Sequence, residues 1–216
     1  MNRMIRFILL SALLGVMTGC VTPPVPKDYS ALRQHQPKSI LVLPPLNNSI
    51  EGNASYSYLS TVTQPLCERG YYVYPVAVVD FFLKENGLPT PGEMHQVALQ
   101  KIDEIIGADA VLYLVVEDYG SKYKILDSST TVSATARLVD VDTGVELWTH
   151  RVTTVQSSSS GGGGIVEMLV SAAISQVINS SVDAAHGVSR INNQRMFNEV
   201  GQGLLPGHRH AEYGVE

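Results

Sequence analysis

The stretch "SILVLPPLNN" at residues 39–48 decides the fold. Ile40 to Leu43 form a continuous apolar run, which is typical of a strand that is buried on both faces of its sheet. Pro44 and Pro45 stop the run. The stretch therefore predicts a strand that other elements cover on both sides.

The chain after this strand predicts a helix and a second strand. Residues 54–69 read as a helix that Asn53 can cap and that Gly70 can end in a left-handed conformation. Pro65 lies inside this span, and a kink or break is expected there because proline removes a helical hydrogen bond. The letters "YYVYPV", at residues 71–76, predict a short strand.

Two more helices and a long strand follow. The first helix is expected over about 76–86 and the second from about 91 to 106, and Gly87 and Gly107 follow their ends. A long strand begins at Ala110 in "DAVLYLVVEDYGSKYKI".

A strand, a tight turn and another strand are predicted over residues 129–156. Asp142, Thr143 and Gly144 give the turn signal, because Gly144 is free to take a positive φ. Apolar and mostly polar residues alternate in the first arm, which indicates a sheet with one buried face. The expected inward-facing residues are Val132, Ala134, Ala136 and Leu138.

The C-terminal third begins with "SSSSGGGG" at residues 157–164. A phosphate-binding loop would need a Lys-Ser/Thr pair after the last glycine, and Ile165-Val166 stand there instead, so a flexible connection is favoured. The next helix, about 165–188, is apolar over most of its surface, so it is either wholly buried or in contact with a partner. A polar helix over about 189–200 and a disordered tail over 201–216 complete the chain.

The N-terminus has the pattern of a secretory signal over residues 1–19, with a basic start and an apolar run. Met17-Thr18-Gly19-Cys20 resembles the bacterial lipobox, in which the cysteine thiol is lipidated and the cysteine becomes the first mature residue. The alternative is a secreted protein without lipid, or a cytosolic one with a chance apolar start. We predict lipidation of Cys20, followed by a proline-rich tether over 20–37 and a domain over 38–200.

Lipidation would place the protein on a membrane without a transmembrane helix, since two or more acyl chains anchor a protein stably. Val21, rather than Asp, follows Cys20. By resemblance to the sorting of Gram-negative lipoproteins, this favours the outer membrane, and we expect its periplasmic face.

Charge argues against nucleic acid as a partner. The signal holds two of the 15 basic residues and none of the 20 acidic ones, so the mature chain has 13 basic against 20 acidic residues, a net charge of −7 with histidine neutral. A chain without a basic patch is poorly suited to a polyphosphate or to anionic lipid.

The residues with reactive side chains do not form a recognisable active site. Cys67 is expected to be a buried hydrophobe, and a reactive Cys-His pair stays the alternative. Histidines and acids are scattered, and the Asp140–Gly144 segment lacks a third ligand and the distal glutamate of a calcium loop, so a hairpin turn is favoured. Glu117 and Asp118 are expected at a strand end, facing solvent. We therefore predict no catalytic residue, no metal and no cofactor, and a tyrosine cluster at 56–74 that is either an interface or a core rim.

Several blocks occur in order: the lipobox, "SILVLPPLNNS", "LCERGYYVYPV", "ADAVLYLVVEDYGSKY" and "ARLVDVDTGVELWTHRV". Together they resemble a family of Gram-negative outer-membrane lipoproteins without an established function. The family is similar in fold to the N-terminal domain of TolB, to CsgG and to LpoB. The resemblance implies a single α/β domain of the TolB N-terminal, anticodon-binding-like type, with a mixed sheet of about five strands and helices packed on it.

Three functions remain open at this point. The first is a non-catalytic binding or assembly component of the envelope, accessory to a secretion or transport complex, with envelope proteins as partners and a homo-oligomer as a possible state. The second is an LpoB-type regulator of cell-wall synthesis. The third is a periplasmic hydrolase that uses Cys67 or a histidine.

Overall fold

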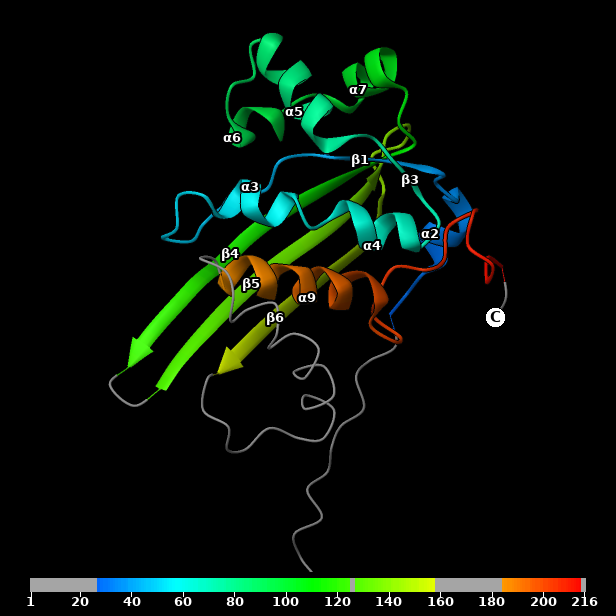
Figure 1. The fold of residues 1–216 in the computed structure, drawn as a ribbon. Coiled ribbons are helices and arrows are strands. Elements are labelled where there is room, and N and C mark those ends of the chain that lie inside the picture. Colours follow the sequence, from blue (N-terminus) through cyan, green and yellow to red (C-terminus); the bar gives the residue numbers. More distant parts are fainter. Residues whose placement is uncertain (1–26, 125–126, 158–183, 215–216) are drawn as a thin grey trace, which may run out of the picture.

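A computed structural model describes residues 27–124, 127–157 and 184–214. They form one mixed six-stranded sheet with helices on both faces (Figure 1). The prediction of an α/β domain is confirmed, with one strand more than the expected five. The strands are β1 (Ser39–Val42), β2 (Leu46–Asn47), β3 (Tyr72–Val73), β4 (Ala110–Lys124), β5 (Asp127–Asp140) and β6 (Glu146–Ser157).

The strands run in the order β3-β1-β4-β5-β6, and β2 also pairs with β4. β1 is parallel to β3 and β4, and β2 is parallel to β4, whereas β5 is antiparallel to both β4 and β6. The extra strand, β2, follows the two prolines that stop β1, so the chain resumes its pairing with β4 after a two-proline interruption. The long β4–β5–β6 meander is thus the frame on which the rest packs.

Helices cover the sheet in two groups. Side chains of α2, α3, α4 and α9 share one apolar core with Ile40 and Val42, and side chains of α5, α6 and α7 share another with Leu41 and Leu43. Alternate residues of β1 therefore enter opposite cores, which confirms the prediction of a strand buried on both faces. The helices are α2 (Ser30–His35), α3 (Ala54–Leu59), α4 (Thr63–Glu68), α5 (Val76–Glu85), α6 (Pro91–Met94), α7 (Leu99–Ile106) and α9 (Ala184–Asn198).

The helix predicted over 54–69 is two short helices, α3 and α4, because the chain breaks after Leu59 and resumes at Thr63. The break lies before Pro65, which occupies the first turn of α4. A proline is tolerated there because the first backbone N–H groups of a helix have no partner within it. Gly70 follows α4 with a φ of 87°, as the sequence indicated.

The helix predicted from about 91 to 106 is also two helices, α6 and α7. Thr90 begins α6 with a capping box, in which its hydroxyl accepts from the N–H of Glu93 and the Glu93 carboxylate accepts from the N–H of Thr90. Gly107 ends α7 with a φ of 72°. The expected start and end were therefore correct, and the interruption was missed.

The predicted hairpin is β5–β6, and its inward residues are buried as expected. The turn is held by Asp140, whose carboxylate accepts from the N–H of Thr143 at 2.9 Å, and Gly144 has a φ of 72°. A β-bulge at Glu117 interrupts the pairing of β4 with β5. Glu117 and Asp118 therefore lie within β4 and not at its end, which corrects the prediction.

The boundary predicted between tether and domain at residues 37 and 38 is too late. Residues 30–35 form α2, whose Leu32 is buried in the core below β6. Tyr29 packs against the same core, and its hydroxyl donates to the carbonyl of Gly203 at 2.6 Å. The described part of the folded domain thus begins at residue 27, because burial of Leu32 holds this segment on the sheet.

The tail predicted to be disordered over 201–216 is packed on the domain over residues 203–210, and residues 211–214 are exposed. Leu204 is fully buried, and its carbonyl accepts from the guanidinium of Arg69. The N–H of Gly207 donates to the carbonyl of Arg69 at 2.7 Å. A Cβ on Gly207 would come within 2.9 Å of the carbonyl oxygen of Gly70, so close backbone contact explains why this glycine-rich tail fits.

Other predictions fall outside the described residues: the signal and lipobox, most of the Ser/Gly segment, and the part of the apolar helix over 165–183. Among the helices that the structure describes, none combines the length and apolar character that a membrane crossing requires.

Candidate interaction surface

Cys20, the one predicted site residue, lies outside the described residues. Cys67 lies on α4 and is exposed, so the prediction of a buried thiol is wrong. The core side of α4 is formed by Pro65 and Leu66, which turns the next residue outward. Within the described chain, no hydrogen bond joins the Cys67 thiol to a histidine.

The histidines serve different structural contacts. His35 Nδ1 lies 3.1 Å from the Asp140 carboxylate, and the Nε2–H of His95 donates to the carbonyl of Pro44 at 2.9 Å. Burial lowers the pKa of His95, and the bond to Pro44 opposes this only in part. Across residues 27–124, 127–157 and 184–214, no three His, Cys, Asp or Glu side chains gather into a set that could hold a metal.

The acidic residues singled out in the sequence are likewise engaged in the fold. Glu117 accepts from the Thr135 hydroxyl at 2.6 Å and pairs with Arg151 across the meander. Burial alone would raise the pKa of Asp140, but hydrogen bonds from Thr143 and the His35 ring outweigh it and leave that pKa below its ordinary value. These carboxylates stabilise strand pairing and a turn.

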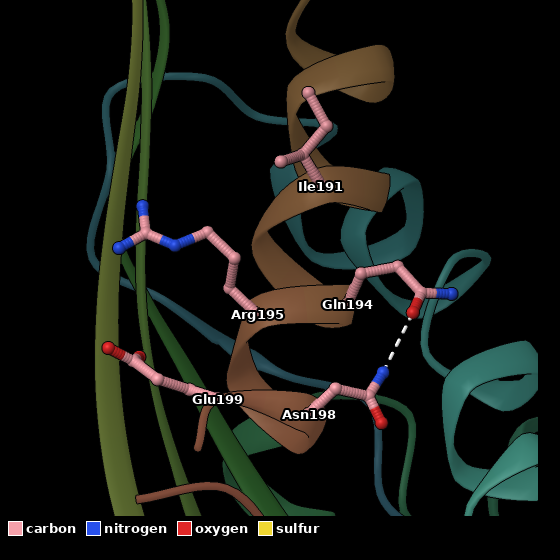
Figure 2. Close-up of a pocket in the computed structure, with 5 residues that line it drawn as sticks. All are labelled: Ile191, Gln194, Arg195, Asn198 and Glu199. Atoms are coloured by element: carbon pink, nitrogen blue, oxygen red, sulfur yellow. Dashed lines mark hydrogen bonds between the residues drawn. The ribbon is translucent and has the colours of Figure 1, made fainter. Parts of the chain in front are cut away.

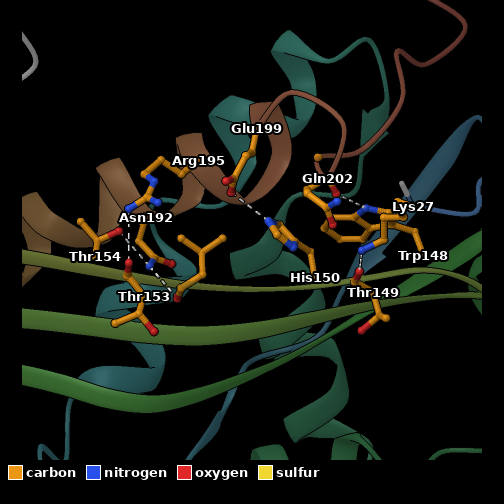
Figure 3. A network of polar contacts seen from close by, with 12 residues as sticks. Lys27, Trp148, Thr149, His150, Thr153, Thr154, Asn192, Arg195, Glu199 and Gln202 are labelled. Atoms are coloured by element: carbon orange, nitrogen blue, oxygen red, sulfur yellow. Dashed lines mark hydrogen bonds and ion pairs between the residues drawn. The ribbon is translucent and has the colours of Figure 1, made fainter. Parts of the chain in front are cut away.

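A polar network joins α9 to the sheet beneath it (Figure 3). Asn192 is fully buried, and its amide donates to the carbonyls of Val132 and Val152 at 3.1 and 3.0 Å, while its oxygen accepts from the Tyr58 hydroxyl at 2.8 Å. Nearer the end of α9, His150 Nε2 lies 3.1 Å from the carboxylate of Glu199. The network sets the position of α9 along β5 and β6.

The outer side of α9 carries a hollow lined by Ile191, Gln194, Arg195, Asn198 and Glu199 (Figure 2). Asn198 donates to the Gln194 side chain at 2.8 Å. Arg195 donates to the carbonyl of Thr153 at 3.2 Å, and Glu199 is the partner of His150. Because its charged groups already hold α9 to β6, the described lining offers no converging set of polar groups for catalysis.

The tyrosines of residues 56–74 divide between core and surface. Tyr58 and Tyr71 are buried, whereas Tyr56 and Tyr72 are 42% and 41% exposed. The Tyr56 hydroxyl donates to the carboxylate of Asp80 on α5 at 3.2 Å. The cluster is therefore both a core element and a surface element, and its exposed part leads to α5.

Helix α5 exposes an apolar surface to solvent. Val79 and Leu83 hold it on the core, while Val78 and Phe81 are 62% and 64% exposed and Phe82 is 36% exposed. Positions three and four residues apart lie next to each other on a helix, so these side chains form one surface. We call the set Ala77, Val78, Phe81 and Phe82 the α5 face.

A polar cluster borders the α5 face. Lys84 Nζ lies 2.7 Å from the carboxylate of Asp80 and 4.7 Å from the centre of the Tyr56 ring. The hydrogen bond to Asp80, and then the one to Tyr56, raises the pKa of Lys84. An apolar centre with a polar border is the composition of protein interfaces.

Sequence reasoning did not single out the α5 face. The letters "VAVVDFFLKE" contained the signal. An amphipathic helix would confine its apolar residues to one side, but seven of these ten residues are apolar. The run is instead apolar on nearly every side of the helix, which leaves part of it outside the core.

These features define a single mixed α/β domain with an apolar surface carried by a helix. The sequence matches the family described as "Putative lipoprotein GNA1162-like" over residues 27–209, and the chain belongs to this family. The resemblance inferred from the ordered sequence blocks is thereby confirmed.

Relatives from Neisseria meningitidis agree with this assignment, and one further structural similarity is weaker. A lipoprotein of Neisseria meningitidis serogroup B is 40% identical over 205 residues, which are 94% of this chain and 95% of that protein. The crystal structure of lipoprotein GNA1162 from Neisseria meningitidis aligns with a TM-score of 0.56 and 47% identity over 67% of this chain and 100% of that chain. The LpoB C-terminal domain from Salmonella enterica aligns with a TM-score of 0.41 and 17% identity, over 55% of this chain and 83% of that chain.

Proposed function

We propose that the protein is an envelope lipoprotein, anchored by Cys20 to the outer membrane and facing the periplasm, that binds another envelope protein through the α5 face. It acts as a non-catalytic component, accessory to a secretion or transport complex. The observation that carries this proposal is the exposure of Val78, Phe81 and Phe82 together on one helix.

The fold does not need these side chains where they are. Val79 and Leu83 already attach α5 to the core through Leu41 and Leu43. Phe81 and Phe82 stay in water, where each leaves apolar area unburied at a cost of roughly 25 cal/mol per Å². Contiguous exposed apolar surface of this kind marks interaction sites in folded proteins.

Membership in a lipoprotein family and the sequence around Cys20 support the anchor. Lipidated cysteine and Val21 are the features on which the outer-membrane location rests. A growing culture labelled with an alkyne fatty acid tests the anchor directly. We expect label on the wild-type protein and none on Cys20→Ser; equal labelling of both would remove the anchor from the proposal.

Binding is tested by crosslinking in cells followed by mass spectrometry. The double variant Phe81→Ser/Phe82→Ser is compared with Val200→Ser, which changes a residue that is 97% exposed elsewhere on the surface. We expect both variants to fold, and only the first to lose an envelope protein that crosslinks to the wild type. An identical set of crosslinked proteins for both variants would contradict the assignment of the α5 face.

A further inference from the structure

The helical layer that carries the α5 face is acidic. Within residues 76–106 five carboxylates stand against two lysines: Asp80, Glu85, Glu93, Asp103 and Glu104 against Lys84 and Lys101. Both lysines are already paired, Lys84 with Asp80 at 2.7 Å and Lys101 with Glu104 at 2.6 Å. The negative charges that remain next to the apolar surface include Glu85, which is exposed on α5 itself.

The negative charge of this layer favours some binding partners of the α5 face over others. An anionic bilayer would be repelled by the same carboxylates. A second copy related by a two-fold axis would bring two such acidic layers together, because the same patch meets itself across that axis. A partner with positive charge around an apolar contact is attracted by both features.

The layer also lies away from the start of the folded chain. The ammonium group of Lys27 lies 5.4 Å from the centre of the Trp148 ring, and Trp148 belongs to the core shared with α2 and α9. Helix α5 belongs to the core on the other face of the sheet. Helix α5, which carries the α5 face, thus packs on the opposite side of the sheet from α2, next to which a tether would join (Figure 1).

We infer that the α5 face binds a basic, apolar segment of another envelope protein, on the side of the domain that is turned away from the anchor. The inference rests on the proposed function and adds the chemistry of the partner. Phe81 and Phe82 provide the apolar contact, and Glu85 with its acidic neighbours selects positive charge.

A binding assay tests the chemistry with defined probes. The full lipidated protein in neutral detergent is titrated with a labelled helical peptide of Leu and Lys, and with one of Leu and Glu of equal length. We expect the Leu/Lys peptide to bind about tenfold more tightly, with the difference shrinking as salt is added. Phe81→Ser/Phe82→Ser should remove the binding, and Val200→Ser should keep it. Equal binding of the two peptides would overturn the inference.

A photo-crosslinking residue at position 81 separates this inference from the proposed function. A crosslinked partner peptide that is basic and apolar, absent when the probe is at position 200, supports the inference. A crosslink to an acidic segment, to lipid or to a second copy of this chain overturns it. An envelope protein that crosslinks through an acidic segment would support the proposed function but not the inference. If no envelope protein crosslinks to position 81, both the proposed function and the inference are contradicted.

Discussion

Replacing Leu204 by alanine tests whether the C-terminal tail belongs to the folded domain. The Leu204 side chain is fully buried in the same core cluster as Phe197. The backbone N–H of Leu204 donates to the Phe197 carbonyl at 3.0 Å. Alanine keeps these backbone contacts, so the substitution removes only the buried side chain.

The expected loss of unfolding free energy is about 2–5 kcal/mol, the range for a buried Leu→Ala change. For a domain of this size each kcal/mol corresponds to about 2–4 °C in Tm, so a loss in the middle of the range, about 3.5 kcal/mol, lowers Tm by roughly 7–14 °C. The neighbouring Gly203 limits relaxation, because a Cβ there would lie 2.6 Å from the Phe197 carbonyl oxygen. The backbone around Leu204 therefore has little freedom to close the cavity.

Urea unfolding followed by tryptophan fluorescence is a suitable assay, since the single Trp148 donates its indole N–H to the carbonyl of Gln202 at 3.0 Å. Val200→Ala is the matched control, because Val200 is 97% exposed and its truncation should cost less than about 0.5 kcal/mol. If Leu204→Ala is as stable as Val200→Ala, the tail does not pack on the domain, and the prediction of a disordered tail is correct.

Three further predictions concern the core and surface. In a Cys20→Ser variant, Cys67 should react with a thiol reagent as fast in the folded domain as after unfolding in urea; protection until unfolding would contradict its exposure. Asn192→Ala should cost about 2–4 kcal/mol in thermal unfolding, because it leaves the buried Tyr58 hydroxyl without its acceptor; a change below about 0.5 kcal/mol would refute this. Despite its burial, Asp140 has a pKa lowered by the Thr143 hydrogen bonds, so its contribution to stability is present above its ordinary value of 3.8 and is lost as the pH falls below it. In urea unfolding between pH 6 and 3, Asp140→Asn should therefore show a weaker fall than the wild type, and parallel curves would count against it.

Elements with a strong local pattern could be predicted from the sequence. The run Ile40–Leu43 indicated a strand with two covered faces, and the alternation from Val132 to Leu138 indicated a strand with one. Gly70 and Gly107 marked helix ends because both take a positive φ. In each case the signal is contained within a few neighbouring residues.

Features that depend on distant contacts could not be predicted. The tail has a composition typical of disorder, yet Leu204 is buried beside Phe197. The Arg69 guanidinium also donates to the Leu204 carbonyl. Leu32 is likewise buried against the sheet, although it lies in the segment over 20–37 that was predicted to be a tether. The exposure of Cys67 depends on how far α4 is rotated, which the break before Thr63 sets.

The candidate site divides in the same way. The lipobox is a local pattern, and the attachment at Cys20 that it indicates stays a prediction. The α5 face is the part of an apolar helix that the core leaves uncovered. Whether Phe81 or Leu83 faces inward depends on the position of α5 over Leu41 and Leu43, which no short stretch of sequence specifies.

The packing of α2 limits how far the domain can travel. Because the folded chain already includes Lys27, seven residue steps separate it from Cys20, and a fully extended chain of that length spans at most about 25 Å. A domain of this size has a radius of gyration of about 16 Å. A domain anchored at Cys20 could therefore move only within a thin layer next to the membrane. A partner would have to present its binding segment within that layer.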